Sequence, residues 1–117
     1  MRILIVEDND MMRLALERAL EQQGHIVHSV TNGEHAIQSL FTEEFDVVIT
    51  DFRMPRMGGL ELTAILRTLF GDSLKIIGMS SSDDCEDQFL NVGTNAYLSK
   101  PIDSEELIKV IDNASVI

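Results

Sequence analysis

Short apolar runs alternate along the chain with longer segments in which apolar positions recur every three to four residues. The short runs have the length and composition of strands and lie at 2–6, 25–30, 45–50, 75–79 and 96–98. The longer segments have helical spacing and lie at 10–23, 34–41, 60–70, 83–92 and from 103 or 104 to about 111. This alternation predicts an α/β fold, a five-stranded parallel sheet with right-handed crossovers and helices on both faces.

The strands differ in how apolar they are. The runs at 2–6 and 45–50 are apolar on both faces, which is typical of buried central strands, whereas 25–30 is less apolar and is expected nearer an edge. Gly58 and Gly59 follow Met57 in a loop, where we expect them to permit a positive φ. The pattern contains no repeat or linker, so residues 1–117 are predicted to form one domain around a single core.

Composition narrows the range of functions. The net charge of -11 argues against direct binding to nucleic acid or to an anionic membrane, both of which require basic patches. The single cysteine, Cys85, excludes an internal disulfide and suits a reducing compartment. No apolar stretch approaches the roughly 20 residues of a membrane span. We therefore expect a soluble cytoplasmic protein.

Charged residues follow three of the predicted strands at the point where each strand ends. Glu7 and Asp8 follow the first, Asp51 follows the third, and Lys100 follows the fifth. The carboxyl ends of parallel strands share one edge of a sheet, so these four side chains should converge. A group of carboxylates is self-repelling and is best explained as a cation site, and oxygen ligands without His or Cys favour Mg²⁺ over zinc or copper.

This arrangement suits phosphoryl transfer. A carboxylate at a strand end can attack phosphorus and form an acyl phosphate, a reaction that depends mainly on charge neutralisation. We expect Asp51 to be phosphorylated, with Lys100 facing the phosphoryl oxygens and Ser80, at the end of the fourth strand, donating its hydroxyl. Asp8 and Asp51 would bind Mg²⁺, and Glu7 would do so directly or through water.

Over its whole length the chain resembles a bacterial two-component response-regulator receiver domain. The motifs that carry this resemblance are ILIVEDN at 3–9, DFRMPRMGGLEL at 51–62, a strand that ends at Ser80, and AYLSKP at 96–101. Their common order and spacing make a chance match very improbable. The resemblance implies the flavodoxin-like strand order 2-1-3-4-5, which places Asp8 and Asp51 on adjacent strands.

The resemblance also implies roles for individual residues. Asp51 matches the phosphorylation site, Asp8 the principal metal-binding acid and Glu7 its partner, and the backbone carbonyl of Arg53 matches the remaining protein ligand of the metal. Lys100 matches the lysine that pairs with the phosphoryl group.

Three further positions match the family. Ser80 corresponds to the switch hydroxyl, and Tyr97 to the aromatic side chain that moves inward when this hydroxyl engages phosphate. The bond before Pro101 is expected to be cis. The chain departs from the usual pattern at 80–93, which is about two residues shorter, and in the strongly acidic start of the helix predicted at 83.

The function implied is a phosphorylation switch. A histidine kinase or histidine phosphotransfer domain would donate the phosphoryl group, and the surface around the fourth helix, fifth strand and fifth helix would signal to an effector protein or a fused output domain. Such a domain is regulatory rather than an enzyme, although it assists its own phosphorylation and dephosphorylation. The chain could be a stand-alone receiver or part of a longer regulator.

Two alternatives belong to other functional classes. One is a phosphate-independent interaction module that keeps only the fold, against which the complete set of acids and the lysine argue. The other is a small phosphatase of the haloacid-dehalogenase type, which would carry a second aspartate two positions after its nucleophile. That position is Arg53 here, and the chain has no cap domain to enclose a substrate.

Overall fold

The five strands form one parallel sheet in the order β2-β1-β3-β4-β5. The computed structural model describes residues 1–116 except 55 and 82–84. The strands are β1 (Arg2–Val6), β2 (Ile26–Val30), β3 (Val47–Asp51), β4 (Lys75–Ser80) and β5 (Ala96–Ser99). The helices are α1 (Asp10–Gln22), α2 (Gly33–Thr42), α3 (Gly59–Phe70), α4 (Cys85–Val92) and α5 (Ser104–Val116), with a short 3₁₀ turn at Gly71–Ser73. The predicted fold class and strand order are confirmed.

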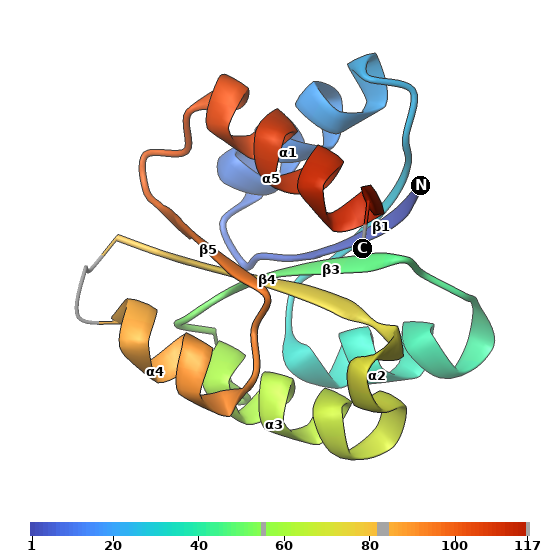
Figure 1. The fold of residues 1–117 in the computed structure, drawn as a ribbon, viewed down its shortest axis with the longest axis vertical. Helices are drawn as coiled ribbons and strands as arrows, with labels where there is room; N and C mark the ends of the chain where they lie inside the picture. Colours follow the sequence, from blue (N-terminus) through green and yellow to red (C-terminus); the bar gives the residue numbers. More distant parts are fainter. Residues whose placement is uncertain (55, 82–84, 117) are drawn as a thin grey trace.

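The helices form two layers that enclose the sheet. Helices α1 and α5 cover one face, and α2, α3 and α4 cover the other (Figure 1). Side chains of a strand alternate between the two faces, so β1 contributes to both cores. Ile3 and Ile5 pack with the core under α1 and α5, whereas Leu4 and Val6 pack with the core under α2 and α3. This explains the apolar character of β1 on both of its faces.

The boundaries agree with the sequence pattern in most places. Strand β2 lies at the edge, as its lower apolar content predicted. Asp51 is itself the last residue of β3 rather than the first residue of the loop. The last helix continues beyond the predicted end near residue 111, to Val116, because 112–116 contains neither Gly nor Pro to stop it. The predicted helix start at residue 83 lies outside the described residues.

Asparagine and aspartate side chains cap the first turns of the helices that follow β1, β2 and β5. The Asn9 carboxamide oxygen accepts a hydrogen bond from the backbone N–H of Met12 at 2.9 Å, and Asn32 does the same for His35. Asp103 accepts a longer bond of 3.4 Å from Glu105. These caps satisfy backbone donors in the first turn and hold each helix close to the edge where the strands end. No helix in the described part of the chain is long and apolar enough to cross a membrane.

The glycines before α3 serve close packing rather than a positive φ. Gly58 has φ -76°, and Gly59 is the first residue of α3, so the expectation of a positive φ at these glycines is wrong. Among the described residues of this loop, Arg56 has a positive φ, at 69°. A Cβ on Gly59 would overlap the carbonyl oxygen of Asp51, whereas one on Gly58 would lie 3.1 Å from the carbonyl oxygen of Phe52. Gly59 therefore allows α3 to begin directly against β3.

We predict that Gly59→Ala lowers the free energy of unfolding by about 2–3 kcal/mol, because the new methyl group meets backbone that cannot move away. Gly58→Ala is the matched control, with an expected loss of about 1 kcal/mol or less. Urea unfolding of both variants measures the difference. Equal losses at the two positions would contradict the close approach at Gly59.

Candidate functional site

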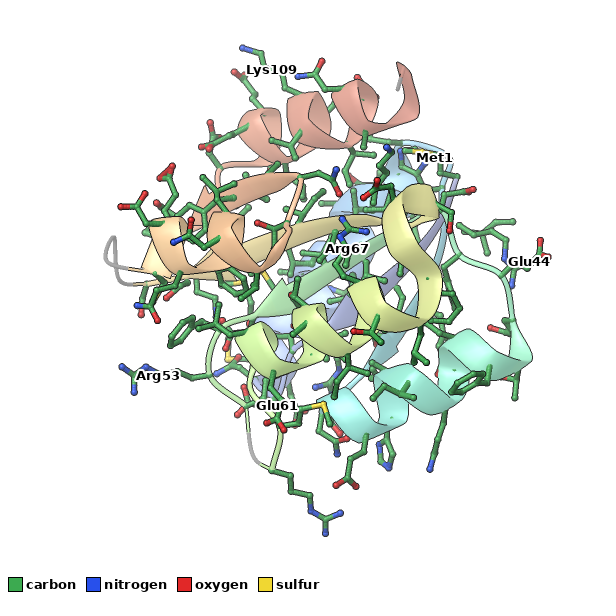
Figure 2. All side chains as sticks on the ribbon, turned by 60° about the horizontal axis from the view of Figure 1, so that its bottom comes forward. Met1, Glu44, Arg53, Glu61, Arg67 and Lys109 are labelled. Carbon is green, nitrogen blue, oxygen red and sulfur yellow. The ribbon has the colours of Figure 1, made fainter. Side chains whose placement is uncertain are left out.

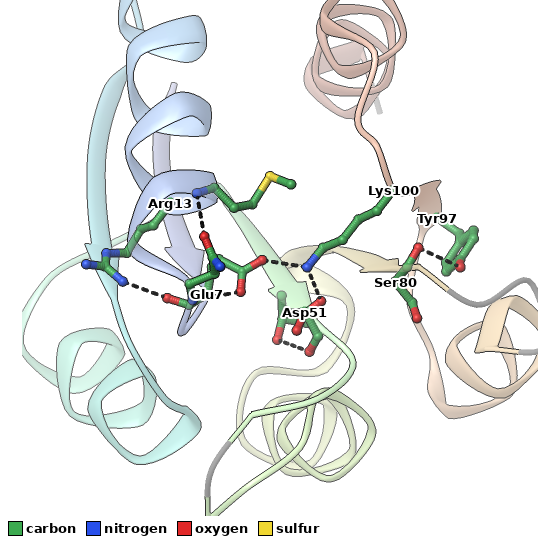
Figure 3. Close-up of polar contacts among 9 residues, drawn as sticks. Glu7, Arg13, Asp51, Ser80, Tyr97 and Lys100 are labelled. Atoms are coloured by element: carbon green, nitrogen blue, oxygen red, sulfur yellow. Dashed lines mark hydrogen bonds and ion pairs between the residues drawn. The ribbon is translucent and has the colours of Figure 1, made fainter.

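The ends of β1, β3 and β5 bring charged side chains together at one edge of the sheet, and Figure 3 shows three of them, Glu7, Asp51 and Lys100. Strands β1 and β3 pair in parallel with Val6 opposite Thr50, so Glu7 and Asp51 follow equivalent positions. Ligand oxygens of Glu7, Asp8 and Asp51 lie within 4.8 Å of one another. The convergence predicted from the strand ends is therefore present in the structure.

Lys100 joins two of these carboxylates. Its ammonium nitrogen lies 2.7 Å from Oε1 of Glu7 and 2.8 Å from Oδ1 of Asp51. The Lys100 backbone N–H donates to the carbonyl oxygen of Ser80 at 2.8 Å, and the Lys100–Pro101 peptide bond is cis. One cation thus links the ends of three strands.

Burial and charge act in opposite directions on these groups. Burial raises the pKa of the Glu7 carboxyl group above its ordinary value, and the negative charge of Asp51 adds to this effect, although hydrogen bonds from Lys100 and Asn9 oppose it. Burial alone would lower the pKa of Lys100, but hydrogen bonds and attraction to Asp51 and Glu7 outweigh it, so this pKa is raised. Lys100 therefore remains charged at neutral pH.

Glu7 is held by the N-cap residue of α1 and by Arg13 within that helix. Its side chain is fully buried, and Oε2 accepts a hydrogen bond of 3.1 Å from the backbone N–H of Asn9. Arg13 donates to the carbonyl oxygen of Glu7 at 3.0 Å and forms an ion pair with Asp10 at 2.6 Å. Sequence reasoning did not identify Arg13, although a basic residue one helical turn into α1, after the acidic pair, is a signal that could have done so.

Asp8 and Arg53 lie at the exposed rim. Asp8 is exposed, in contrast to buried Glu7 and Asp51, and opens the acidic cluster to solvent. The Arg53 side chain points outward (Figure 2), with its guanidinium 5.8 Å from the centre of the Phe52 ring. The role of the Arg53 backbone carbonyl as a metal ligand stays a prediction.

The cluster fits Mg²⁺. It offers carboxylate oxygens alone, within one small volume, and Mg²⁺ typically binds through one or two carboxylates and retains several waters. Three carboxylates against one ammonium group leave an excess of negative charge that a divalent cation would balance.

Ser80 and Tyr97 lie beside the acidic cluster rather than within it. The Ser80 side chain is buried at the end of β4, and its hydroxyl donates to the Cys85 sulfur at 3.4 Å. On the adjacent strand, the Tyr97 hydroxyl donates to the Ser80 carbonyl oxygen, also at 3.4 Å. The two predicted switch residues are therefore neighbours (Figure 3). Cys85, for which the sequence pattern indicated no role, contacts one of them.

Comparison with known proteins gives a consistent result. The response regulator receiver domain family matches residues 3–112. The response regulator MprA of Mycolicibacterium vanbaalenii is 35% identical over 109 residues, which cover 92% of this chain and 47% of MprA. The chain therefore spans about half the length of this relative.

Solved structures agree over almost the whole chain. A putative response regulator from Chloroflexus aurantiacus superposes with a TM-score of 0.95 at 27% identity, covering 99% of this chain and 98% of that one. The response regulator TrrA from Thermotoga maritima, solved in complex with Mg²⁺-BeF, gives 0.90 at 28% identity, with 97% of each chain covered.

We predict that Mg²⁺ stabilises the protein and that Asp8→Asn abolishes this effect. A ligand at ten times its dissociation constant raises the free energy of unfolding by about 1.4 kcal/mol. Urea unfolding in EDTA and in Mg²⁺ measures the difference. Glu21→Gln, which removes an exposed charge from α1, is the control and should respond like the wild type. An undiminished Mg²⁺ effect in Asp8→Asn would contradict the assignment of Asp8.

A second prediction follows from the raised pKa of Glu7. Folded Glu7 keeps its proton at a pH where the unfolded chain, with a carboxyl pKa near 4.5, has lost it. The contribution of Glu7 to stability therefore falls as the pH rises from 4.5 through the raised pKa. The loss is about 1.4 kcal/mol for each pH unit that separates the folded and unfolded pKa values.

Glu7→Gln removes this titration but keeps an acceptor for the Asn9 N–H. In EDTA, its stability relative to the wild type should increase between about pH 4 and pH 8, as measured by urea unfolding at fixed ionic strength. If the difference in stability between Glu7→Gln and the wild type stays constant or decreases over this range, the ion pair with Lys100, rather than burial, determines the pKa of Glu7.

Proposed function

Because this chain belongs to the response regulator receiver domain family, we propose that it is a phospho-accepting switch in which Asp51 receives the phosphoryl group. The observation that carries the proposal is the position of Asp51, whose carboxylate lies 2.8 Å from the Lys100 ammonium and beside the carboxylates of Glu7 and Asp8. Residues 1–117 would constitute the receiver unit of a two-component system.

The proposed reaction is a displacement at phosphorus. A carboxylate oxygen of Asp51 attacks the phosphoryl group of a phosphohistidine, the N–P bond breaks, and its electron pair remains on the imidazole of the donor. Lys100 supplies positive charge beside the attacking carboxylate, where negative charge gathers on the phosphoryl oxygens. Asp8 and Asp51 would hold Mg²⁺, with the Arg53 carbonyl, and with Glu7 directly or through water. Bound Mg²⁺ would supply further neutralisation of those oxygens.

Phosphorylation would then redistribute the contacts of Lys100 and Ser80. The new group carries a charge of about -2 at neutral pH and three acceptor oxygens. Lys100 would exchange its contact with the Asp51 carboxylate for the phosphoryl group, and the Ser80 hydroxyl would exchange the Cys85 sulfur for a phosphoryl oxygen. Tyr97, whose hydroxyl contacts the Ser80 carbonyl, would follow, and the surface of α4, β5 and α5 would shift toward its active arrangement.

The partners follow from this chemistry. The donor would be a histidine kinase or a histidine phosphotransfer domain, and the receiver of the signal an effector protein or a fused output domain. The greater length of the MprA relative is compatible with a fused domain. A cytoplasmic location stays a prediction, as does the assistance that the domain gives to its own phosphorylation and dephosphorylation.

The alternatives account for less of the site. A phosphate-independent module has no need for a buried glutamate, an aspartate and a lysine in mutual contact. A haloacid-dehalogenase-type phosphatase needs a general acid two residues after Asp51, where Arg53 projects to solvent.

The test is the intact mass after incubation with acetyl phosphate, with and without Mg²⁺. We expect one phosphoryl adduct that requires Mg²⁺, is absent from Asp51→Asn and is retained in Asp72→Asn, which removes an exposed aspartate remote from the site. No adduct on folded, Mg²⁺-loaded wild type would favour the phosphate-independent module.

A further inference from the structure

One buried ring connects α4 to both Asp51 and Tyr97. Phe89 of α4 is fully buried. Its ring centre lies 5.6 Å from that of Phe52, the residue after Asp51, in an edge-to-face arrangement at 82°. The Phe89 ring centre also lies 6.1 Å from that of Tyr97 in β5. The three aromatic rings therefore form a continuous packed path from the loop after β3 to β5.

Two glycines make room for this ring. A Cβ built on Gly78 of β4 would lie 2.6–2.8 Å from Cγ, Cδ1 and Cδ2 of Phe89, and one on Gly59 of α3 would lie 3.0 Å from its Cζ. A side chain at Gly78 would displace the ring, because real Cβ atoms do not approach other atoms so closely, and one at Gly59 would make a tight contact with it. The Phe89 ring thus fills a space between β4 and the start of α3. This close packing fixes α4 against the sheet.

Phe52 is attached firmly to the strand ends around Asp51. Its backbone N–H donates to the Met79 carbonyl oxygen, and its own carbonyl accepts from the Gly59 N–H, both at 2.9 Å. A displacement of the backbone at Asp51 therefore moves the Phe52 ring. Because the Phe89 ring is closely packed against Phe52 and Gly78, it must shift when the Phe52 ring moves.

We propose that Phe89 is a positioning residue of the switch, whose ring couples the state of Asp51 to Tyr97 and to the placement of α4. This inference rests on the proposed phosphorylation of Asp51. Asp51 and Tyr97 would then be coupled through apolar contacts as well as through the polar contacts of Ser80. The apolar coupling depends on the close fit of the Phe89 ring against Gly78.

The chain provides its own reporter for this coupling. Tyr97 is the only tyrosine and the chain has no tryptophan, so tyrosine fluorescence reports on this position alone. In the wild type, addition of acetyl phosphate with Mg²⁺ should change this emission. In Phe89→Leu, intact mass should show the same phosphoryl adduct, while the emission change per adduct decreases by about threefold or more, as expected when a residue on a coupling path is altered.

Two controls separate coupling from simple loss of packing. Leu90→Ala changes the adjacent α4 residue, which is 45% exposed, and should keep the wild-type response. The double variant Gly78→Ala/Phe89→Leu refills part of the vacated space, so it should recover stability toward urea without recovering the emission change. This double variant also carries the test if Phe89→Leu alone does not fold.

The outcomes distinguish this inference from the function on which it rests. Absence of an adduct on the wild type overturns both. An adduct on the wild type without any change in Tyr97 emission, or an undiminished change in folded, phosphorylated Phe89→Leu or in the double variant, overturns the role of Phe89 and leaves the phosphorylation of Asp51 intact.

Discussion

The site depends on the two ion pairs that the ammonium group of Lys100 forms with Glu7 and Asp51. This group lies within 2.8 Å of both Glu7 and Asp51, and Lys100 follows Glu7 by 93 positions along the chain, directly after β5. A fully buried glutamate beside an aspartate is costly unless a cation accompanies it. Lys100 supplies this cation and so holds the carboxyl ends of β1, β3 and β5 in one place. The same charge faces the position that a phosphoryl group on Asp51 would occupy.

The fold explains why a few residues are enough to form the site. Parallel strands place their carboxyl ends along one edge, and the order β2-β1-β3-β4-β5 puts the acids of β1 next to Asp51 of β3. Gly59 lets α3 start directly against this edge, and Asn9 both caps α1 and donates its backbone N–H to Glu7. The site residues therefore also help to join the helices to the sheet. Removal of their charges should change the stability of the protein as well as phosphoryl transfer.

The sequence predicted the parts of the structure that follow from local pattern. Strand and helix periods indicated the elements, and the position of charged residues at strand ends was enough to predict that Glu7, Asp8, Asp51 and Lys100 converge. The strand order came from the resemblance, because alternation alone does not determine it. Features that depend on long-range packing were missed, since no local period encodes them. These include the contact of Arg13 with the Glu7 carbonyl and the seating of the Phe89 ring on Gly78.

In the proposed function, Glu7, Asp8 and Lys100 make Asp51 a metal-assisted acceptor for a phosphoryl group. Fluorine NMR with beryllofluoride, a mimic of that group, tests this proposal most directly. We expect bound fluoride resonances that appear only with Mg²⁺, persist in Glu21→Gln, and are absent from Asp51→Asn. Bound resonances that survive in Asp51→Asn, or none at all on the folded wild type with saturating Mg²⁺, would contradict it.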